Sequence, residues 1–253
     1  MKQDERWDEI WNEKRRSSSG KLGTFLAKDI IHRTVMGILR REIPDPGGKR
    51  VMEEGSGTGL VSLGLAGRGA TVFLLDKSDE ALAFSRAAFA GAGRDHLATQ
   101  ASIIDLPFKD ASFDFVWSGG VIEHFTLEQQ IRILKEMLRV TRPGGRVIVI
   151  APSAGARIYG KAKAYADSRN AWQPGYEVPI SSLGEVAAGA GAELAREYRL
   201  GLLAELHFLK YYFGGLKPLR MAWAGLVEII SRILFPLNRL PGYLLVSVFE
   251  RKS

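Results

Sequence analysis

Two patterns of apolar residues divide the chain into a helical leader and an alternating core. Residues 1–42 are predicted to be helical, because their apolar side chains recur at helical spacing. These side chains form two faces: Trp7, Ile10 and Trp11, then Ile30, Ile31, Val35, Ile38 and Leu39. A turn at residues 44–48, Pro-Asp-Pro-Gly-Gly, ends the leader.

From residue 49 onward, short apolar runs alternate with helical patterns. The predicted strands are Arg50–Glu54, Thr71–Leu75, Ala98–Ile104, Phe113–Trp117, Arg146–Ile150, Glu193–Leu200 and Tyr243–Glu250. The predicted helices are Leu60–Ala66, Asp79–Ala90, Leu127–Val140 and Ser181–Ala190, and a turn is predicted at Arg142–Gly145. Strands separated by helices of this length indicate right-handed βαβ units and a parallel sheet.

Two segments interrupt this alternation. Residues 151–180 show no strong period, and residues 202–239 place Leu, Ile and Trp at helical spacing between arginines. We interpret the second segment as two helices that pack over the sheet or against a second subunit. The alternative is an amphipathic lid for a lipid-linked or membrane-proximal acceptor. We expect both segments to cover the carboxyl-terminal edge of the sheet, where ligands bind in open α/β folds.

Composition narrows the chemistry. The chain has 253 residues and no cysteine, which excludes disulfides and thiol nucleophiles. Its four histidines do not stand at metal-ligand spacing, so no metal site is predicted. The first residues are charged and no run approaches about 18 uncharged apolar residues, so we expect a cytoplasmic protein.

Positive charge is concentrated at the two ends of the chain. The net charge is +7, with +4 on residues 1–50, −2 on residues 51–195 and +5 on residues 196–253. Basic ends suit an anionic acceptor, a membrane surface or nucleic acid, and they equally suit a solvated surface.

A glycine loop and an acid carry the strongest chemical signal. Residues 55–59, Gly-Ser-Gly-Thr-Gly, follow a predicted strand and open a helix. Glycines let the backbone turn sharply and approach a ligand. Asp76 ends the next predicted strand, where a carboxylate accepts hydrogen bonds from ribose hydroxyls. A dinucleotide fingerprint would need a sixth-position glycine, and this chain has Leu60 there.

Five ordered motifs then resemble one family. The motifs are Val51-Met52-Glu53-Glu54-Gly55-Ser56-Gly57-Thr58-Gly59, Asp105-Leu106-Pro107-Phe108, Ser112-Phe113-Asp114-Phe115-Val116, Val121-Ile122-Glu123-His124-Phe125 and Leu138-Arg139-Val140-Thr141-Arg142-Pro143-Gly144-Gly145. Over residues 45–151 the sequence resembles the class I S-adenosylmethionine-dependent methyltransferases. The resemblance implies a Rossmann-like, doubly wound sheet of seven strands, mostly parallel with the last strand antiparallel. It also implies the cofactor S-adenosyl-L-methionine and the product S-adenosyl-L-homocysteine.

The resemblance assigns the cofactor-binding residues one by one. They are Glu53, Gly55, Ser56, Gly57, Asp76, Lys77, Ser102, Ile103, Ser118 and Gly119. Two positions depart from the family. Glu54 replaces an apolar residue, and we expect it to have a partner because an unpaired buried carboxylate is costly. Ser102 replaces an aspartate that hydrogen-bonds the adenine.

The predicted activity is methyl transfer to a small-molecule, glycan or lipid-linked acceptor. His124 is the candidate general base, with a supporting hydrogen-bonding role as the alternative. Tyr159, Tyr165, Trp172 and Tyr176 either line an acceptor pocket or serve as core and surface residues. A nucleic-acid methyltransferase and a non-catalytic cofactor-binding protein are the alternative functions.

The expected organisation is a helical lid over residues 1–45 and a methyltransferase domain over residues 46–253. Insertions at 151–180 and 202–239 interrupt that domain. The expected partner is a small or anionic acceptor, with a peripheral membrane contact and a homodimer as further hypotheses. Nucleic acid is disfavoured because the basic residues do not form long runs.

Overall fold

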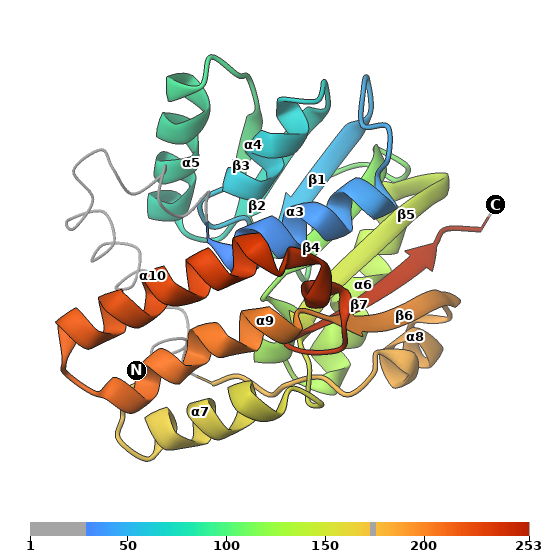
Figure 1. Ribbon diagram of the computed structural model, residues 1–253. Coiled ribbons are helices and arrows are strands. Elements are labelled where there is room, and N and C mark those ends of the chain that lie inside the picture. The colour runs from blue at the N-terminus through green and yellow to red at the C-terminus, as the bar shows by residue number, and fades with distance from the viewer. Residues whose placement is uncertain (1–28, 173–175, 253) are drawn as a thin grey trace.

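The computed structural model describes residues 29–172 and 176–252, and a seven-stranded sheet runs through its centre (Figure 1). The strands are β1 (Arg50–Glu54), β2 (Thr71–Asp76), β3 (Leu97–Gln100), β4 (Phe113–Gly119), β5 (Thr141–Pro152), β6 (Leu194–Leu200) and β7 (Leu244–Glu250). Their order is β3-β2-β1-β4-β5-β7-β6. β7 pairs antiparallel with β5 and β6, and the other pairs are parallel. The predicted fold class is confirmed.

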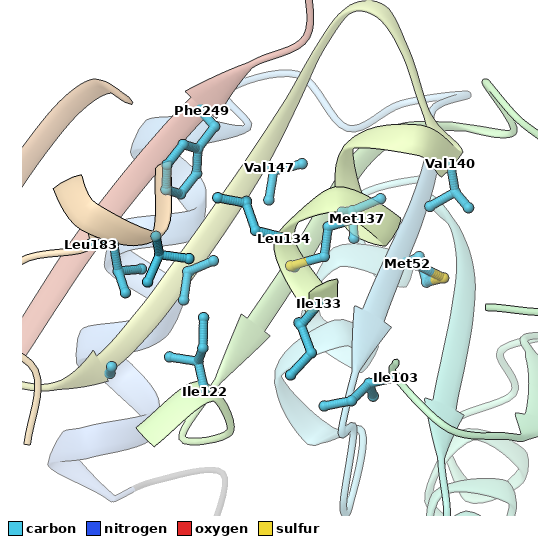
Figure 2. Close-up of a cluster of buried hydrophobic side chains, with 14 of the residues drawn as sticks. Met52, Ile103, Ile122, Ile133, Leu134, Met137, Val140, Val147, Leu183 and Phe249 are labelled. Atoms are coloured by element: carbon cyan, nitrogen blue, oxygen red, sulfur yellow. The ribbon is translucent and has the colours of Figure 1, made fainter. Parts of the chain in front are cut away.

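Helices cover both faces of the sheet. On one face, α3 (Ile30–Glu42), α4 (Leu60–Ala66) and α5 (Asp79–Gly91) pack against strand residues such as Val51, Leu74 and Trp117. The other face carries α6 (Leu127–Val140) and α8 (Gly184–Ala190), and Figure 2 shows its buried side chains. Alternate residues of a strand point to opposite faces, so β1 supplies Val51 to the first core and Met52 to the second.

The helix α6 begins and ends where the sequence pattern predicts. Thr126 and Gln129 form a reciprocal capping box at its start, which satisfies backbone N–H groups that have no partner within the helix. Ile133, Leu134 and Met137 recur at helical spacing and are buried against the sheet. In the N-terminal leader, the apolar residues at helical spacing from Ile30 onward form α3, and Ile38 and Leu39 are buried there.

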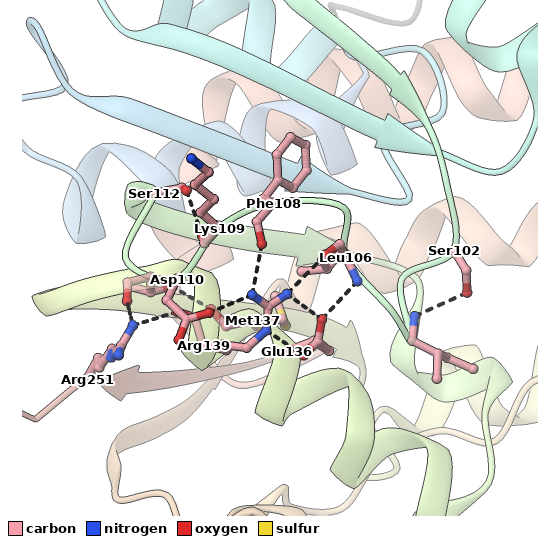
Figure 3. A network of polar contacts seen from close by, with 12 residues as sticks. Ser102, Leu106, Phe108, Lys109, Asp110, Ser112, Glu136, Met137, Arg139 and Arg251 are labelled. Atoms are coloured by element: carbon pink, nitrogen blue, oxygen red, sulfur yellow. Dashed lines mark hydrogen bonds and ion pairs between the residues drawn. The ribbon is translucent and has the colours of Figure 1, made fainter.

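The predicted strand Ala98–Ile104 is too long, because β3 ends at Gln100. Ala101 N–H donates to the carbonyl of Asp76, and the Ser102 hydroxyl accepts from Ile104 N–H at 3.2 Å, which turns the chain out of the sheet. Arg139 of α6 holds the loop that follows (Figure 3). Its guanidinium donates to the carbonyls of Leu106 and Phe108 and pairs with Asp110 and Glu136.

Two other predicted boundaries differ from the structure. The predicted turn Arg142–Gly145 lies inside β5, where the pairing register with β4 shifts between Phe113 and Phe115. The helix predicted from Ser181 begins at Gly184, because the Ser182 hydroxyl accepts from Gly184 N–H and forms a turn first.

The two inserted segments form a helical cap. It consists of α7 (Arg157–Asp167), α9 (Leu202–Glu205), the 3-10 helix η2 (Leu206–Phe213), α10 (Lys217–Ile233) and the 3-10 helix η3 (Phe235–Arg239). The sequence pattern missed α7, because its buried face consists of Tyr159, Ala162 and Ala166, and alanine gives little apolar periodicity.

This cap lies at the carboxyl-terminal edge of the parallel strands (Figure 1). β5 leads into it at Pro152, which pairs with Leu244, the first residue of the antiparallel β7. The structure therefore places both insertions at the expected edge. Trp7 and Trp11 of the predicted N-terminal helical lid lie outside the described residues. Within the described residues, no helix is long and apolar enough to cross a membrane.

Candidate functional site

The glycine loop joins β1 to α4 at the carboxyl-terminal edge of the sheet. Gly55, Gly57 and Gly59 all have positive φ, at 60°, 49° and 64°. Ser56 N–H donates to the carbonyl of Leu75 at 3.0 Å, and Gly59 N–H donates to the carbonyl of Ser56 at 2.8 Å. Left-handed backbone at three alternating positions requires glycine, which explains the G-x-G-x-G spacing.

Gly59 must also be small. A Cβ at this position would lie 2.6 Å from Leu74 Cδ1 and 3.1 Å from Ser85 Cβ. We expect Gly59→Ala to lower the free energy of unfolding by about 2 kcal/mol, from backbone strain and overpacking together. Gly48→Ala is the matched control, since Gly48 has a φ of 66° with nothing within 4 Å of an added Cβ. Equal losses in urea unfolding would show that packing plays no part.

Asp76 ties the loop to the end of β2. Its Oδ1 accepts from Ser78 N–H at 2.9 Å and its Oδ2 accepts from Gly57 N–H at 2.8 Å. Burial raises the pKa of Asp76, and these backbone hydrogen bonds act against that rise. A carboxylate has about four acceptor positions, so two bonds leave capacity for two donor hydroxyls. The acid predicted from the sequence therefore meets the glycine loop directly.

Glu53 lies beneath the same loop. The pKa of Glu53 is raised to about 8, and burial is the main cause. Hydrogen bonds from Ser62 oppose this rise, and the nearby Asp76 adds to it. Within the described residues, Glu53 Oε2 and the Ser56 hydroxyl are buried without a hydrogen-bond partner. Buried polar atoms are normally satisfied, so two such atoms beside a glycine loop fit a polar ligand with amine and hydroxyl groups.

Glu54 does not have the partner that we expected. Its side chain is fully buried, and in the described part of the chain neither carboxyl oxygen has a hydrogen-bond partner. Burial raises the pKa of Glu54 far above its ordinary value, and the nearby Glu136 raises it further. Because β1 alternates its side chains, Glu54 lies on the Met52 face of the sheet, away from Glu53. Burial therefore favours the protonated form of Glu54, and among the described residues the expected partner is not found.

The remaining predicted cofactor residues follow β2 and β3 or lie at the end of β4. Lys77 follows β2 and is exposed, and its carbonyl accepts from the Gln100 side chain. Ser118 is buried and pairs in register with Glu54, and Gly119 ends β4. Ser102 and Ile103 lie in the loop after β3 that Arg139 holds. The sequence analysis missed Arg139 as a positioning residue, although it belongs to a recognised motif.

His124 ends the short 3-10 helix η1 (Ile122–His124) that follows β4. Its Nδ1 lies 2.5 Å from the carbonyl of Tyr176, which can only accept, so Nδ1 carries the proton and Nε2 is the basic nitrogen. Burial lowers the pKa of His124, and the cationic Lys77 and Lys163 lower it further. His124 is therefore neutral at pH 7, with positive charge nearby.

A second acidic group lies between η1 and the cap. Glu123 is buried, its Oε2 has no partner within the described residues, and burial raises its pKa to about 8 with Glu177 adding to the rise. Glu177 accepts hydrogen bonds from the Tyr159 hydroxyl and, at 3.3 Å, from Trp172 Nε1. Burial raises the pKa of Glu177 to about 7. No sequence signal identified Glu177, a single acid in an aperiodic segment.

An aromatic cluster lies beside Glu177. Tyr159, Trp172, Phe208 and Tyr243 contact one another with ring centroids 4.6–6.3 Å apart. Burial raises the pKa of the Tyr243 hydroxyl, with Glu177 and Glu123 contributing. Two of the four predicted pocket aromatics thus belong to a buried cluster, whereas Tyr176 is exposed and Tyr165 packs on Tyr212.

The comparisons with known proteins agree with this geometry. A family model described as a methyltransferase domain matches residues 52–149, the segment from β1 to β5 that contains the glycine loop, Asp76 and η1. Residues 52–149 of the chain thus match a methyltransferase domain. This match supports the resemblance found in the sequence, and the orphaned Glu53 and Ser56 atoms fit the cofactor that the resemblance implies.

The relatives that match this domain are named for varied acceptors. This chain is 35% identical over 109 residues to a demethylmenaquinone methyltransferase of Clavibacter sepedonicus. The matched segment covers 43% of each chain. The chain is 51% identical over 47 residues to a probable tRNA methyltransferase 9B of Mus musculus, covering 18% of this chain and 10% of that protein. The chain thus spans less than half the length of these relatives.

The fold extends further than the sequence similarity. A geranyl diphosphate C-methyltransferase from Streptomyces coelicolor, solved with S-adenosyl-L-homocysteine, superimposes with a TM-score of 0.60 at 16% identity. The superposition covers 87% of this chain and 79% of that one, so the two proteins share the fold.

Proposed function

We propose that this methyltransferase transfers a methyl group from S-adenosylmethionine to a small molecule with an apolar body and an ionisable group. The observation that carries the proposal is the meeting of two sites at one sheet edge. The glycine loop with Asp76 lies at the ends of β1 and β2, and the acid pair Glu123 and Glu177 lies beside β4 under the cap.

In this proposal, Glu53, Ser56 and Asp76 hold the cofactor. Asp76 accepts from the ribose hydroxyls, and Glu53 accepts from the methionine amine through its orphaned Oε2. The backbone of Gly55, Gly57 and Gly119 contacts the cofactor, and Lys77, Ser102, Ile103 and Ser118 border it. The bound cofactor supplies an electrophilic methyl group with a neutral leaving group, so positioning by the protein accounts for most of the catalysis.

The acceptor would occupy the space between η1 and the aromatic cluster. The buried cluster of Tyr159, Trp172 and Tyr243 forms an apolar wall beside this space, and Lys77 and Lys163 provide positive charge near His124. An acceptor with an aromatic or aliphatic body and an acidic hydroxyl or carbon acid matches both features. The small-molecule acceptors named for the demethylmenaquinone and tocopherol methyltransferases among the relatives support this class.

Glu123 is our candidate for the general base, with His124 in a supporting role. A base whose pKa lies near the working pH transfers protons efficiently, and burial raises the pKa of Glu123 to about 8. His124 already donates Nδ1–H to the Tyr176 carbonyl, and burial lowers its pKa. The hydrogen bond of His124 then fixes the loop that bears Glu177.

The pH dependence of turnover separates these two candidates. Glu123 must lose its proton to act, so turnover should rise between about pH 6 and pH 8. Glu123→Gln should reduce turnover by about 10²- to 10⁴-fold and remove the rise. His124→Gln should leave the rise in place. A profile that already levels off below pH 6.5, and that only His124→Gln alters, would contradict the assignment.

The proposed activity is tested with labelled cofactor. Purified protein is incubated with S-adenosylmethionine carrying a labelled methyl group and a panel of phenolic, quinol and carboxylic small molecules, with transfer RNA as a separate arm. We expect label in at least one small-molecule product and none in RNA. Label only in RNA would overturn the acceptor class. Cofactor binding without transfer to any acceptor, in the panel or in a whole-cell extract, would favour the non-catalytic alternative.

A further inference from the structure

The outer side of α10 carries an apolar stripe. Leu219, Leu226 and Ile233 recur every seven residues, and Ile229 lies three residues after Leu226, so these four side chains share one helix face. They are 50%, 47%, 73% and 59% exposed. Leu216 before the helix and Leu237 and Leu240 after it are exposed as well. An apolar face of this length is unusual on a monomer surface and marks an interaction site.

The rest of the protein fixes this orientation of α10. Val227 and Ser231 are buried on the packed side of the helix. Trp223 Nε1 donates to the carbonyl of Leu206 at 2.8 Å, and Glu228 pairs with Arg33 of α3. Because these contacts hold the opposite side, the stripe cannot turn inward without breaking them. Figure 1 shows α10 as an outer element of the cap.

Positive charge lies beside the stripe. Residues 202–240 contain five Lys/Arg and two Asp/Glu. One of these acids, Glu205, is buried and accepts from Ile158 N–H, and the other, Glu228, already pairs with Arg33 and Arg232. The exposed surface of this segment is therefore basic.

A basic cavity opens at the C-terminal end of the same helix. It has a volume of about 510 Å³ and lies between α3, α4 and the α10–η3 junction. Arg33, Arg40, Arg232 and His32 are among its lining residues. Glu228 pairs with Arg33 and Arg232, and no Asp or Glu is among the described residues that line the cavity.

We infer that the α10 stripe and this cavity form a docking site for an anionic bilayer surface, with α10 lying in the interface plane. The stripe would enter the boundary between headgroups and acyl chains, and the cavity would take a lipid phosphate. A second copy of the chain fits less well. Two copies that paired along α10 would bring the basic flanks together, and the only partly exposed acid of the segment is already engaged. The inference does not depend on the proposed acceptor.

Vesicle co-sedimentation tests the inference with the full chain. We expect binding to vesicles of phosphatidylcholine with about one third phosphatidylglycerol, weaker binding to pure phosphatidylcholine, and a severalfold loss at high salt. The double substitution Leu226→Gln with Ile229→Gln should weaken binding tenfold or more. Leu97→Gln is the matched control, because Leu97 is 53% exposed at the start of β3, on the opposite edge of the sheet from the cap.

Two charge-reversal variants test whether the cavity contributes to vesicle binding. Arg40→Glu should weaken binding by about fivefold or more and reduce its dependence on salt. Arg94→Glu makes the same change in net charge after α5 and should leave binding within twofold. Equal losses in the two variants would show that net charge, and not the cavity, attracts the vesicles.

A fluorescent reporter covers the case in which a glutamine variant fails to fold. The chain has no cysteine, so Ile229→Cys and Leu97→Cys each introduce a unique thiol for an environment-sensitive dye. Anionic vesicles should shift the emission at position 229 to shorter wavelength and leave position 97 unchanged. No vesicle binding by the full chain would overturn the inference. A dimer in light scattering that dissociates in the Leu226/Ile229 variant, without vesicle binding, would assign the stripe to a second copy.

Discussion

Replacing Asp76 by alanine is expected to weaken the binding of S-adenosylhomocysteine by about 10- to 100-fold. The carboxylate has the acceptor capacity for two ribose hydroxyls, and hydrogen bonds to a charged group contribute about 1.5–3 kcal/mol. The same carboxylate holds the glycine loop through Gly57 N–H, so its loss also loosens the backbone that the cofactor contacts. Isothermal titration calorimetry measures the change directly.

His124→Ala is the comparison for this result and should leave cofactor affinity within about twofold. In the proposed arrangement His124 contacts the Tyr176 carbonyl and borders the acceptor, not the ribose. Asp76→Asn should lie between wild type and Asp76→Ala, because the amide keeps one acceptor oxygen. Equal losses for Asp76→Ala and His124→Ala would contradict the assignment of Asp76, provided that circular dichroism shows both variants folded.

Glu54→Leu is expected to stabilise the protein, by an amount that grows with pH. Removing a buried polar group that has no partner contributes about 1–3 kcal/mol. Burial also raises the pKa of Glu54 well above the ordinary value that it regains on unfolding. Above about pH 4.5 the folded state therefore keeps a proton that the unfolded state loses, and the free energy of unfolding falls as pH rises.

Leucine removes this penalty, so its advantage over wild type should increase as the pH rises above the ordinary pKa of a glutamate. Urea unfolding at several pH values measures it. Glu54→Gln is the matched control, because glutamine keeps an unpaired polar group but cannot titrate. This variant should remove the pH dependence that Glu54 causes. At pH 5 it should give little of the stabilisation expected for Glu54→Leu. A gain for Glu54→Leu that is the same at pH 5 and pH 8 would show that Glu54 is ionised in the folded protein.

Local signals in the sequence determined most of the core. Apolar periodicity fixed the bounds of α6, and the G-x-G-x-G spacing by itself located three residues with positive φ. Asp76 was predicted from its place at a strand end, because parallel strands bring their carboxyl ends to one edge. The ordered motifs between residues 51 and 145 were sufficient to recognise the methyltransferase domain and its fold.

Only the tertiary structure decided the environment of the acids and the shape of the cap. Glu54 and Glu53 are neighbours in sequence, yet strand alternation sends one into a core without a partner and the other beneath the glycine loop. Glu177 meets Tyr159 and Trp172 through contacts across an aperiodic segment. The sequence predicted that the apolar residues of α10 lie on a helix. The contacts of Trp223, Val227 and Glu228 with other elements determine which of those residues face solvent. Local pattern specifies which side chains share a face, whereas the partners of that face come from segments distant in sequence.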